Sequence, residues 1–91
     1  MDKYYGSISQ KKLEELGWYK DHEFASTMQK DDFILDCWQI DGVGKMDILL
    51  SIKDNINGKP IQRGVEDWYR DLYRGDTLTQ EQLEKLIKIE L

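Results

Sequence analysis

Apolar and polar residues alternate most clearly between residues 33 and 52. In residues 46–53 every second side chain is apolar, which places these side chains on one face of an extended strand. Residues 33–40 are also rich in Phe, Ile, Leu and Trp, and residues 41–45 between the two runs contain two glycines. Such glycines favour a tight reversal of the chain. We therefore predict a central β-hairpin over residues 33–52.

The first strand of this hairpin carries large apolar side chains on both faces. Phe33, Leu35 and Cys37 fall on one face, and Ile34, Trp38 and Ile40 fall on the other. Either a central strand covered on both sides or an exposed apolar patch used for binding explains this pattern. Because aromatic side chains are usually buried, we expect the covered strand. Whether Trp38 and Ile40 are buried is left open.

Two helices are indicated by their end signals. Ser9 is a suitable N-cap, and Gly17 stands where a helix often ends in a left-handed residue, so a helix is expected at about 9–16. Thr79, with a glutamine three residues later, forms a capping-box pattern and predicts a helix at about 79–89.

A third helix is predicted at about 65–74. Its apolar residues recur at the spacing of one helical face, with acidic residues in the first turn and arginines near the end. The residues on that face are Val65, Trp68, Tyr69, Leu72 and Tyr73. With one or two short strands in 18–29, we predict an α+β fold over a single domain, 1–91, in which three helices pack on an antiparallel sheet of three to five strands.

Composition narrows the class of protein. The chain has 91 residues, of which 40% are hydrophobic and 34% charged, which is typical of one soluble globular domain. We expect a cytoplasmic protein, because the sequence has neither a long apolar run nor the order of a signal peptide. The formal charge of −5 disfavours direct binding of nucleic acid and favours a basic protein partner.

No residue pattern predicts catalysis, a metal site or a cofactor. His22 lies between Asp21 and Glu23 without ligands at metal-binding spacing. Cys37 lies in an apolar run, where a buried thiol behaves as a small hydrophobe. The glycines of 41–45 lack the spacing of a phosphate-binding loop. We therefore predict that the protein is not an enzyme.

Aromatic and arginine side chains are the feature with functional potential, because Trp, Tyr and Arg are enriched at the energetic centres of protein interfaces. The predicted helix at 65–74 combines all three. The candidate partner-binding residues are Trp38, Glu66, Asp67, Tyr69, Arg70, Tyr73 and Arg74.

The layout also resembles a known group of proteins. A short helix with the sequence Leu-Glu-Glu-Leu-Gly-Trp (13–18), a few strands and a closing helix with Leu-Thr-Gln-Glu-Gln-Leu-Glu-Lys-Leu (78–86) look like those of short single-domain proteins of bacteria and their phages. Small acidic domains of this kind are similar to anti-CRISPR proteins, which as a class are compact, enzyme-free and bind an effector nuclease. The class shares no sequence signature, so the resemblance assigns no residue a role.

Together these observations predict a non-enzymatic protein-binding inhibitor of a host nucleic-acid-handling complex, such as a CRISPR effector nuclease. An acidic and aromatic surface would occupy a basic groove of that complex. One alternative is an immunity protein that neutralises a basic nuclease toxin. Another alternative is a protein that binds a small molecule such as a nucleotide. Such a protein would need an apolar pocket with convergent polar groups. We expect no membrane association, and the sequence leaves the oligomeric state open.

Overall fold

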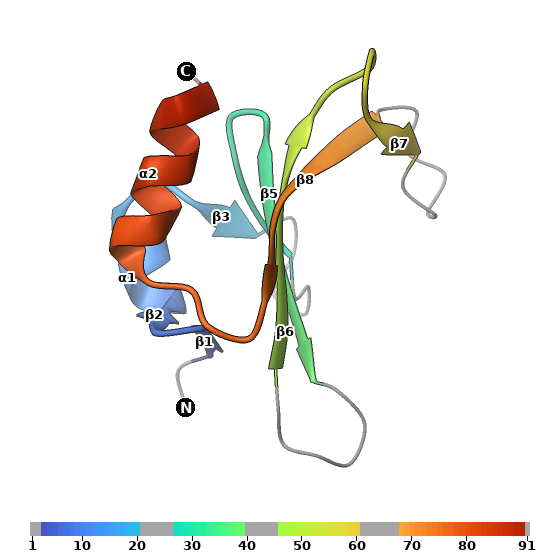
Figure 1. Ribbon diagram of the computed structural model, residues 1–91. Coiled ribbons are helices and arrows are strands. Elements are labelled where there is room, and N and C mark those ends of the chain that lie inside the picture. The colour runs from blue at the N-terminus through green and yellow to red at the C-terminus, as the bar shows by residue number, and fades with distance from the viewer. Residues whose placement is uncertain (1–2, 21–26, 40–45, 61–67, 91) are drawn as a thin grey trace.

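The protein is built around a six-stranded antiparallel sheet (Figure 1). The computed structural model describes residues 3–20, 27–39, 46–60 and 68–90. The strand order in the large sheet is β3-β4-β5-β6-β8-β7, and β1 and β2 form a separate two-stranded sheet. The elements are β1 (Tyr4–Tyr5), β2 (Ile8–Ser9), α1 (Gln10–Glu15), β3 (Tyr19–Lys20), β4 (Met28–Lys30), β5 (Phe33–Gln39), β6 (Met46–Lys53), β7 (Lys59–Pro60), β8 (Trp68–Gly75) and α2 (Gln80–Glu90).

The predicted strands of the central hairpin are confirmed as β5 and β6. They pair in continuous register from Phe33 opposite Ile52 to Gln39 opposite Met46. The alternation on β6 also has the predicted consequence, because Ile48 and Leu50 are both 0% exposed. The predicted turn at 41–45 lies outside the described residues.

One side of the large sheet is covered. Both helices and the small β1–β2 sheet lie on this side (Figure 1). The core forms between these layers and the sheet, where the buried apolar side chains make one continuous cluster. Its members are Tyr5, Ile8, Leu13, Trp18, Met28, Phe33, Leu35, Cys37, Ile48, Leu50, Leu78 and Leu83.

The ends of the helices follow the predicted local chemistry. The Ser9 hydroxyl accepts a hydrogen bond of 3.1 Å from the Lys12 backbone N–H at the start of α1. Gly17, just past the end of α1, has a φ of +99°, which glycine adopts at little cost. Before α2, the Thr79 hydroxyl accepts from the Gln82 backbone N–H while the Gln82 side chain accepts from the Thr79 N–H. Both helices are therefore specified locally.

The predicted fold, a sheet of three to five strands with three helices, is wrong. The large sheet has six strands, a second small sheet is present, and residues 68–75 form the long strand β8 in place of the predicted helix at 65–74. Residues 65–67 lie outside the described part of the chain.

A β-bulge explains the error over β8. Leu50 of β6 pairs with Tyr73 and the next residue, Ser51, pairs with Asp71, so Leu72 is an extra residue in β8. A bulge interrupts the two-residue period of a strand. Leu72 and Tyr73, adjacent in sequence, can therefore both pack against the core. The resulting apolar spacing imitates that of a helix, although Trp and Tyr favour strands.

Within the described residues, no helix is long and apolar enough to cross a membrane.

Candidate functional site

The second side of the large sheet has a different character from the first. No described helix lies over it (Figure 1), and its apolar side chains are only partly buried. We call this surface the open face. It is formed by alternate residues of the central strands, namely Ile34, Asp36, Trp38, Asp47, Leu49, Ser51, Lys53, Tyr69, Asp71 and Arg74.

Trp38 is half-buried on the open face and has a charged neighbour above its ring. The guanidinium carbon of Arg74 lies 5.7 Å from the centre of the Trp38 ring, a distance at which a cation is attracted to the aromatic face. Arg74 also forms an ion pair of 3.1 Å with Asp47, which stands opposite Trp38 on β6. The Arg74 side chain is 63% exposed, so the indole is shielded by a group that remains in water.

A hollow of about 180 Å³ lies on the open face, and its lining includes neither Trp38 nor Arg74. It combines apolar side chains with two carboxylates and one amine. The carboxylate of Asp71 accepts a hydrogen bond of 3.3 Å from the Ser51 hydroxyl, which fixes its position across the β6–β8 pair. The residues that line this hollow are Ile34, Asp36, Leu49, Ser51, Lys59, Pro60, Tyr69 and Asp71.

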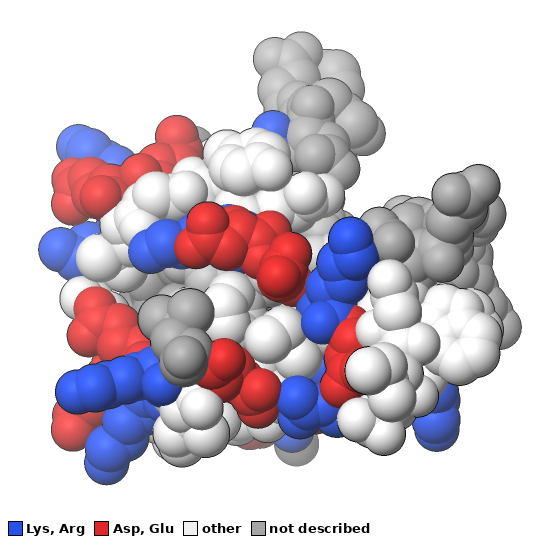
Figure 2. All heavy atoms as spheres, turned by 90° about the horizontal axis from the view of Figure 1, so that it is seen from above, with Lys and Arg blue, Asp and Glu red and all other residues white. Residues whose placement is uncertain are grey.

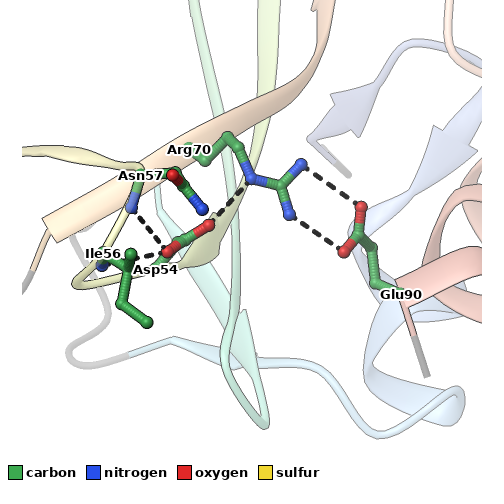
Figure 3. Close-up of polar contacts among 5 residues, drawn as sticks. All are labelled: Asp54, Ile56, Asn57, Arg70 and Glu90. Atoms are coloured by element: carbon green, nitrogen blue, oxygen red, sulfur yellow. Dashed lines mark hydrogen bonds and ion pairs between the residues drawn. The ribbon is translucent and has the colours of Figure 1, made fainter.

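The Arg70 side chain forms ion pairs with two carboxylates of the protein itself, those of Asp54 and Glu90 (Figure 3). Its Nε donates to Asp54 Oδ2 at 3.0 Å, and its terminal nitrogens donate to the two oxygens of Glu90 at 3.0 and 3.4 Å. The backbone N–H of Asn57, the Arg70 side chain and the N–H of Ile56 lower the pKa of Asp54. Hydrogen bonds from Arg70 to Glu90 and Asp54 raise the pKa of the guanidinium. This network ties the end of β6 to β8 and to the end of α2.

The structure separates the predicted partner-binding residues into two groups. Trp38, Tyr69 and Arg74 all lie on the open face. Tyr69 pairs with Lys53, at the other end of β6 from Asp47, which pairs with Trp38, so Tyr69 lies apart from the other two. Arg70 points to α2 on the covered side, as its bonds to Glu90 show.

Tyr73 also belongs to the covered side. It packs against the core and donates its hydroxyl proton to the carbonyl oxygen of Thr77. Glu66 and Asp67 lie outside the described residues, so their predicted role stays a prediction.

Of the eight residues that line the hollow, only Tyr69 was in the predicted set. The seven others are Ile34, Asp36, Leu49, Ser51, Lys59, Pro60 and Asp71. The sequence could have indicated Leu49 as a site residue, because it is the one large apolar residue on the otherwise polar face of β6. No sequence pattern could have indicated Asp71, because its position beside Ser51 depends on the bulge in β8.

Cys37, one of the residues weighed for chemistry in the sequence, does not line this site. Cys37 is 1% exposed and belongs to the core. Burial raises the pKa of its thiol, which keeps the sulfur in the unreactive protonated form. Within residues 3–20, 27–39, 46–60 and 68–90, no group of three or more His, Cys, Asp or Glu side chains is placed to hold a metal ion. His22 lies outside these ranges.

The negative charge is unevenly divided along the chain. Of its 18 acidic and 13 basic residues, 12 and 11 are among the described residues, so these are almost neutral together. Figure 2 shows acidic and basic side chains interspersed on one side of the molecule, without a large field of either sign. Most of the excess acid belongs to sequence segments outside the described ranges, including Asp21, Glu23, Glu66 and Asp67.

Comparison of the chain with protein-family models, with curated proteins and with solved structures finds no match.

Proposed function

We propose that the protein is a non-enzymatic binding domain that contacts a protein partner through the open face. The observation that carries this proposal is the difference in burial between the two sides of the large sheet. Ile34, Trp38, Leu49 and Tyr69 remain half-buried on the open face, whereas the core side of the same strands is sealed by helices. Partly exposed apolar and aromatic groups within a polar rim are characteristic of protein interfaces.

The charge supports a basic partner. The chain carries a formal charge of −5, and the hollow on the open face contains two carboxylates and one amine. Our proposal in its sharper form is an inhibitor of a host nucleic-acid-handling complex, such as a CRISPR effector nuclease, in the cytoplasm of a bacterial cell. By occupying a basic groove of that complex, the protein would exclude nucleic acid from it.

The hollow argues against a nucleotide as the ligand. Pockets for small molecules usually enclose about 300–1,000 Å³, which exceeds the 180 Å³ found here. Asp36 and Asp71 would also repel phosphate groups. An immunity protein that neutralises a basic nuclease toxin differs from the proposed inhibitor only in its partner, and the experiment below separates the two.

Matched substitutions on the two sides of the sheet test the proposal. Leu49→Arg adds charge and bulk at the centre of the open face, and Ile89→Arg makes the same kind of change on α2, where Ile89 is 76% exposed. The wild-type protein is used to capture host proteins, and the recovered complex is assayed for nucleic-acid cleavage with and without the protein. We expect Leu49→Arg to weaken binding and inhibition by more than about tenfold, as at an interface centre, and Ile89→Arg to leave both unchanged.

The proposal fails if the purified protein neither binds a nucleic-acid-handling complex nor alters its cleavage of target. Recovery of a basic nuclease toxin as the sole tight partner would identify an immunity protein. Equal effects of the two arginine substitutions would move the interface away from the open face. Circular dichroism of both variants shows whether they remain folded.

A further inference from the structure

The hollow on the open face has a chemical character more specific than that of a general interface. We infer that it accepts a single arginine side chain from the protein partner, an inference that rests on the proposed function.

The apolar lining suits the stem of a long basic side chain. Ile34 and Leu49 from the central strands and Pro60 from the edge strand β7 all line the hollow. The three methylene groups of an arginine lose contact with water when they pack on such residues, while the charged end stays at the polar margin. Tyr69 lines the same space, and a guanidinium group stacks well on an aromatic ring.

The charged lining selects a cation. Asp36 on β5 and Asp71 on β8 contribute two carboxylates, and Lys59 on β7 contributes one amine. These three side chains together carry one negative charge. The exposed carboxylate of Asp71 is held by the Ser51 hydroxyl, so an incoming guanidinium meets an acceptor that is already oriented. Phosphate or carboxylate ligands would be repelled.

Arginine fits these features better than lysine does. Its planar guanidinium is more weakly hydrated than an ammonium group, presents several donors to a carboxylate and stacks on tyrosine at the same time. The size agrees as well, because about 180 Å³ is below the range for small-molecule pockets and suits one inserted side chain. The hollow therefore provides a place for an anchor residue of the partner.

The first test uses short peptides and needs no identified partner. The full chain, labelled with ¹⁵N, is titrated with acetyl-Gly-Arg-Gly-amide, and the backbone amide signals are followed by NMR. Acetyl-Gly-citrulline-Gly-amide is the matched control, because citrulline has nearly the shape of arginine without its charge. We expect the arginine peptide to shift the signals of Leu49, Ser51 and Asp71 in a saturable manner at millimolar concentration, with the lysine analogue weaker and the citrulline analogue silent. Equal shifts from arginine and citrulline, or no shifts in the hollow, would overturn the inference.

Two substitutions of opposite expected sign provide the second test. Asp71→Asn removes a carboxylate, and Lys59→Met removes the competing amine while keeping an unbranched side chain. We expect Asp71→Asn to weaken binding of the arginine peptide about two- to fivefold, the range for one solvent-exposed ion pair, and Lys59→Met to strengthen it by a similar factor. Glu81→Gln is the control, because it removes one negative charge from an exposed residue of α2, on the other side of the sheet. An unchanged affinity in both hollow variants, or the same loss in Glu81→Gln, would show that the hollow does not recognise arginine.

Failure of this inference is distinguishable from failure of the proposed function. If Leu49→Arg abolishes capture of the partner while Asp71→Asn and Lys59→Met bind it as the wild type does, the open face is the interface and the hollow is not an arginine site. If the arginine peptide binds in the hollow but no protein partner is captured, the binding specificity stands and the proposed function fails.

Discussion

The two faces of the large sheet are made by the same strands, yet one face is buried and the other is exposed to solvent. On β6, Ile48 and Leu50 are 0% exposed under the helices, whereas Leu49 between them is half-buried on the open face. The covered face holds only apolar side chains at its centre, while the open face mixes Trp38 and Leu49 with aspartates. The difference teaches that strand alternation specifies two surfaces, one that forms the core and one that meets solvent.

The largest effect on stability is expected from a comparison of two adjacent leucines, Leu49 and Leu50. Leu50→Ala should lower the free energy of unfolding by about 3 kcal/mol, because it leaves a cavity in the packed core. Leu49→Ala should cost about 1 kcal/mol, since its side chain already contacts water. Urea unfolding of both variants measures the difference. Similar losses would mean that both faces are equally buried, and the comparison would break down.

The next prediction concerns the layer of helices and the β1–β2 sheet that covers one side of the large sheet. Gly6 has a φ of +68°, and a Cβ placed on it would lie 2.5 Å from the backbone nitrogen and oxygen of Leu78, in the connection that leads to α2. Gly6→Ala should therefore reduce stability by at least about 2 kcal/mol, because the left-handed conformation and the clash both oppose the side chain. Thermal unfolding measures this loss. Ser7→Ala, which removes the neighbouring hydroxyl, should cost less; equal losses would point away from the close approach at Gly6.

A smaller effect is expected on the open face. Arg74→Ala removes the exposed ion pair to Asp47 and the cation above Trp38, interactions worth about 0.5–1 kcal/mol at such sites. Tryptophan fluorescence should shift toward longer wavelength as Trp38 gains contact with water. Arg74→Lys, which keeps the charge, should shift it less. An unchanged spectrum in Arg74→Ala would show that Arg74 does not shield the indole.

The smallest effect concerns the network of Asp54, Arg70 and Glu90, which connects the sheet to α2. This effect depends on pH. Because the folded protein lowers the pKa of Asp54, ionised Asp54 contributes stability above the ordinary aspartate pKa of about 3.9. That contribution is lost as the pH falls through the lowered value. Asp54→Asn should therefore be less stable than the wild type at neutral pH, and urea midpoints measured toward pH 2 should converge. A gap that stays constant with pH would contradict this role of the carboxylate.

How far the sequence predicts the fold depends on how local the signal is. The caps at Ser9 and Thr79 and the alternation on β6 involve neighbours in the chain, and the structure confirms them. The strand β8 depends on pairing with β6 and on the extra residue Leu72, which no local pattern reveals. Tertiary pairing there overrides an apparent helical period.

The site was partly predictable for the same reason. Apolar residues on both faces of β5 indicated either a strand covered on both sides, which we expected, or an exposed patch at Trp38. The expected cover is wrong for the described residues, and the structure places Trp38 half-buried on the open face. Ile40 lies outside the described residues. The hollow could not be foreseen, because Asp36, Lys59 and Asp71 come together only through the order of strands β5, β6, β8 and β7.

The central claim, that one face of the sheet is sealed and the other meets solvent, is tested most directly by methyl NMR with a soluble gadolinium chelate. The chelate accelerates relaxation of methyl groups that it can approach. The structure predicts strong relaxation of the Ile34 and Leu49 methyl signals and little effect on those of Leu35, Ile48 and Leu50. Equal protection of the two sets would contradict an open face.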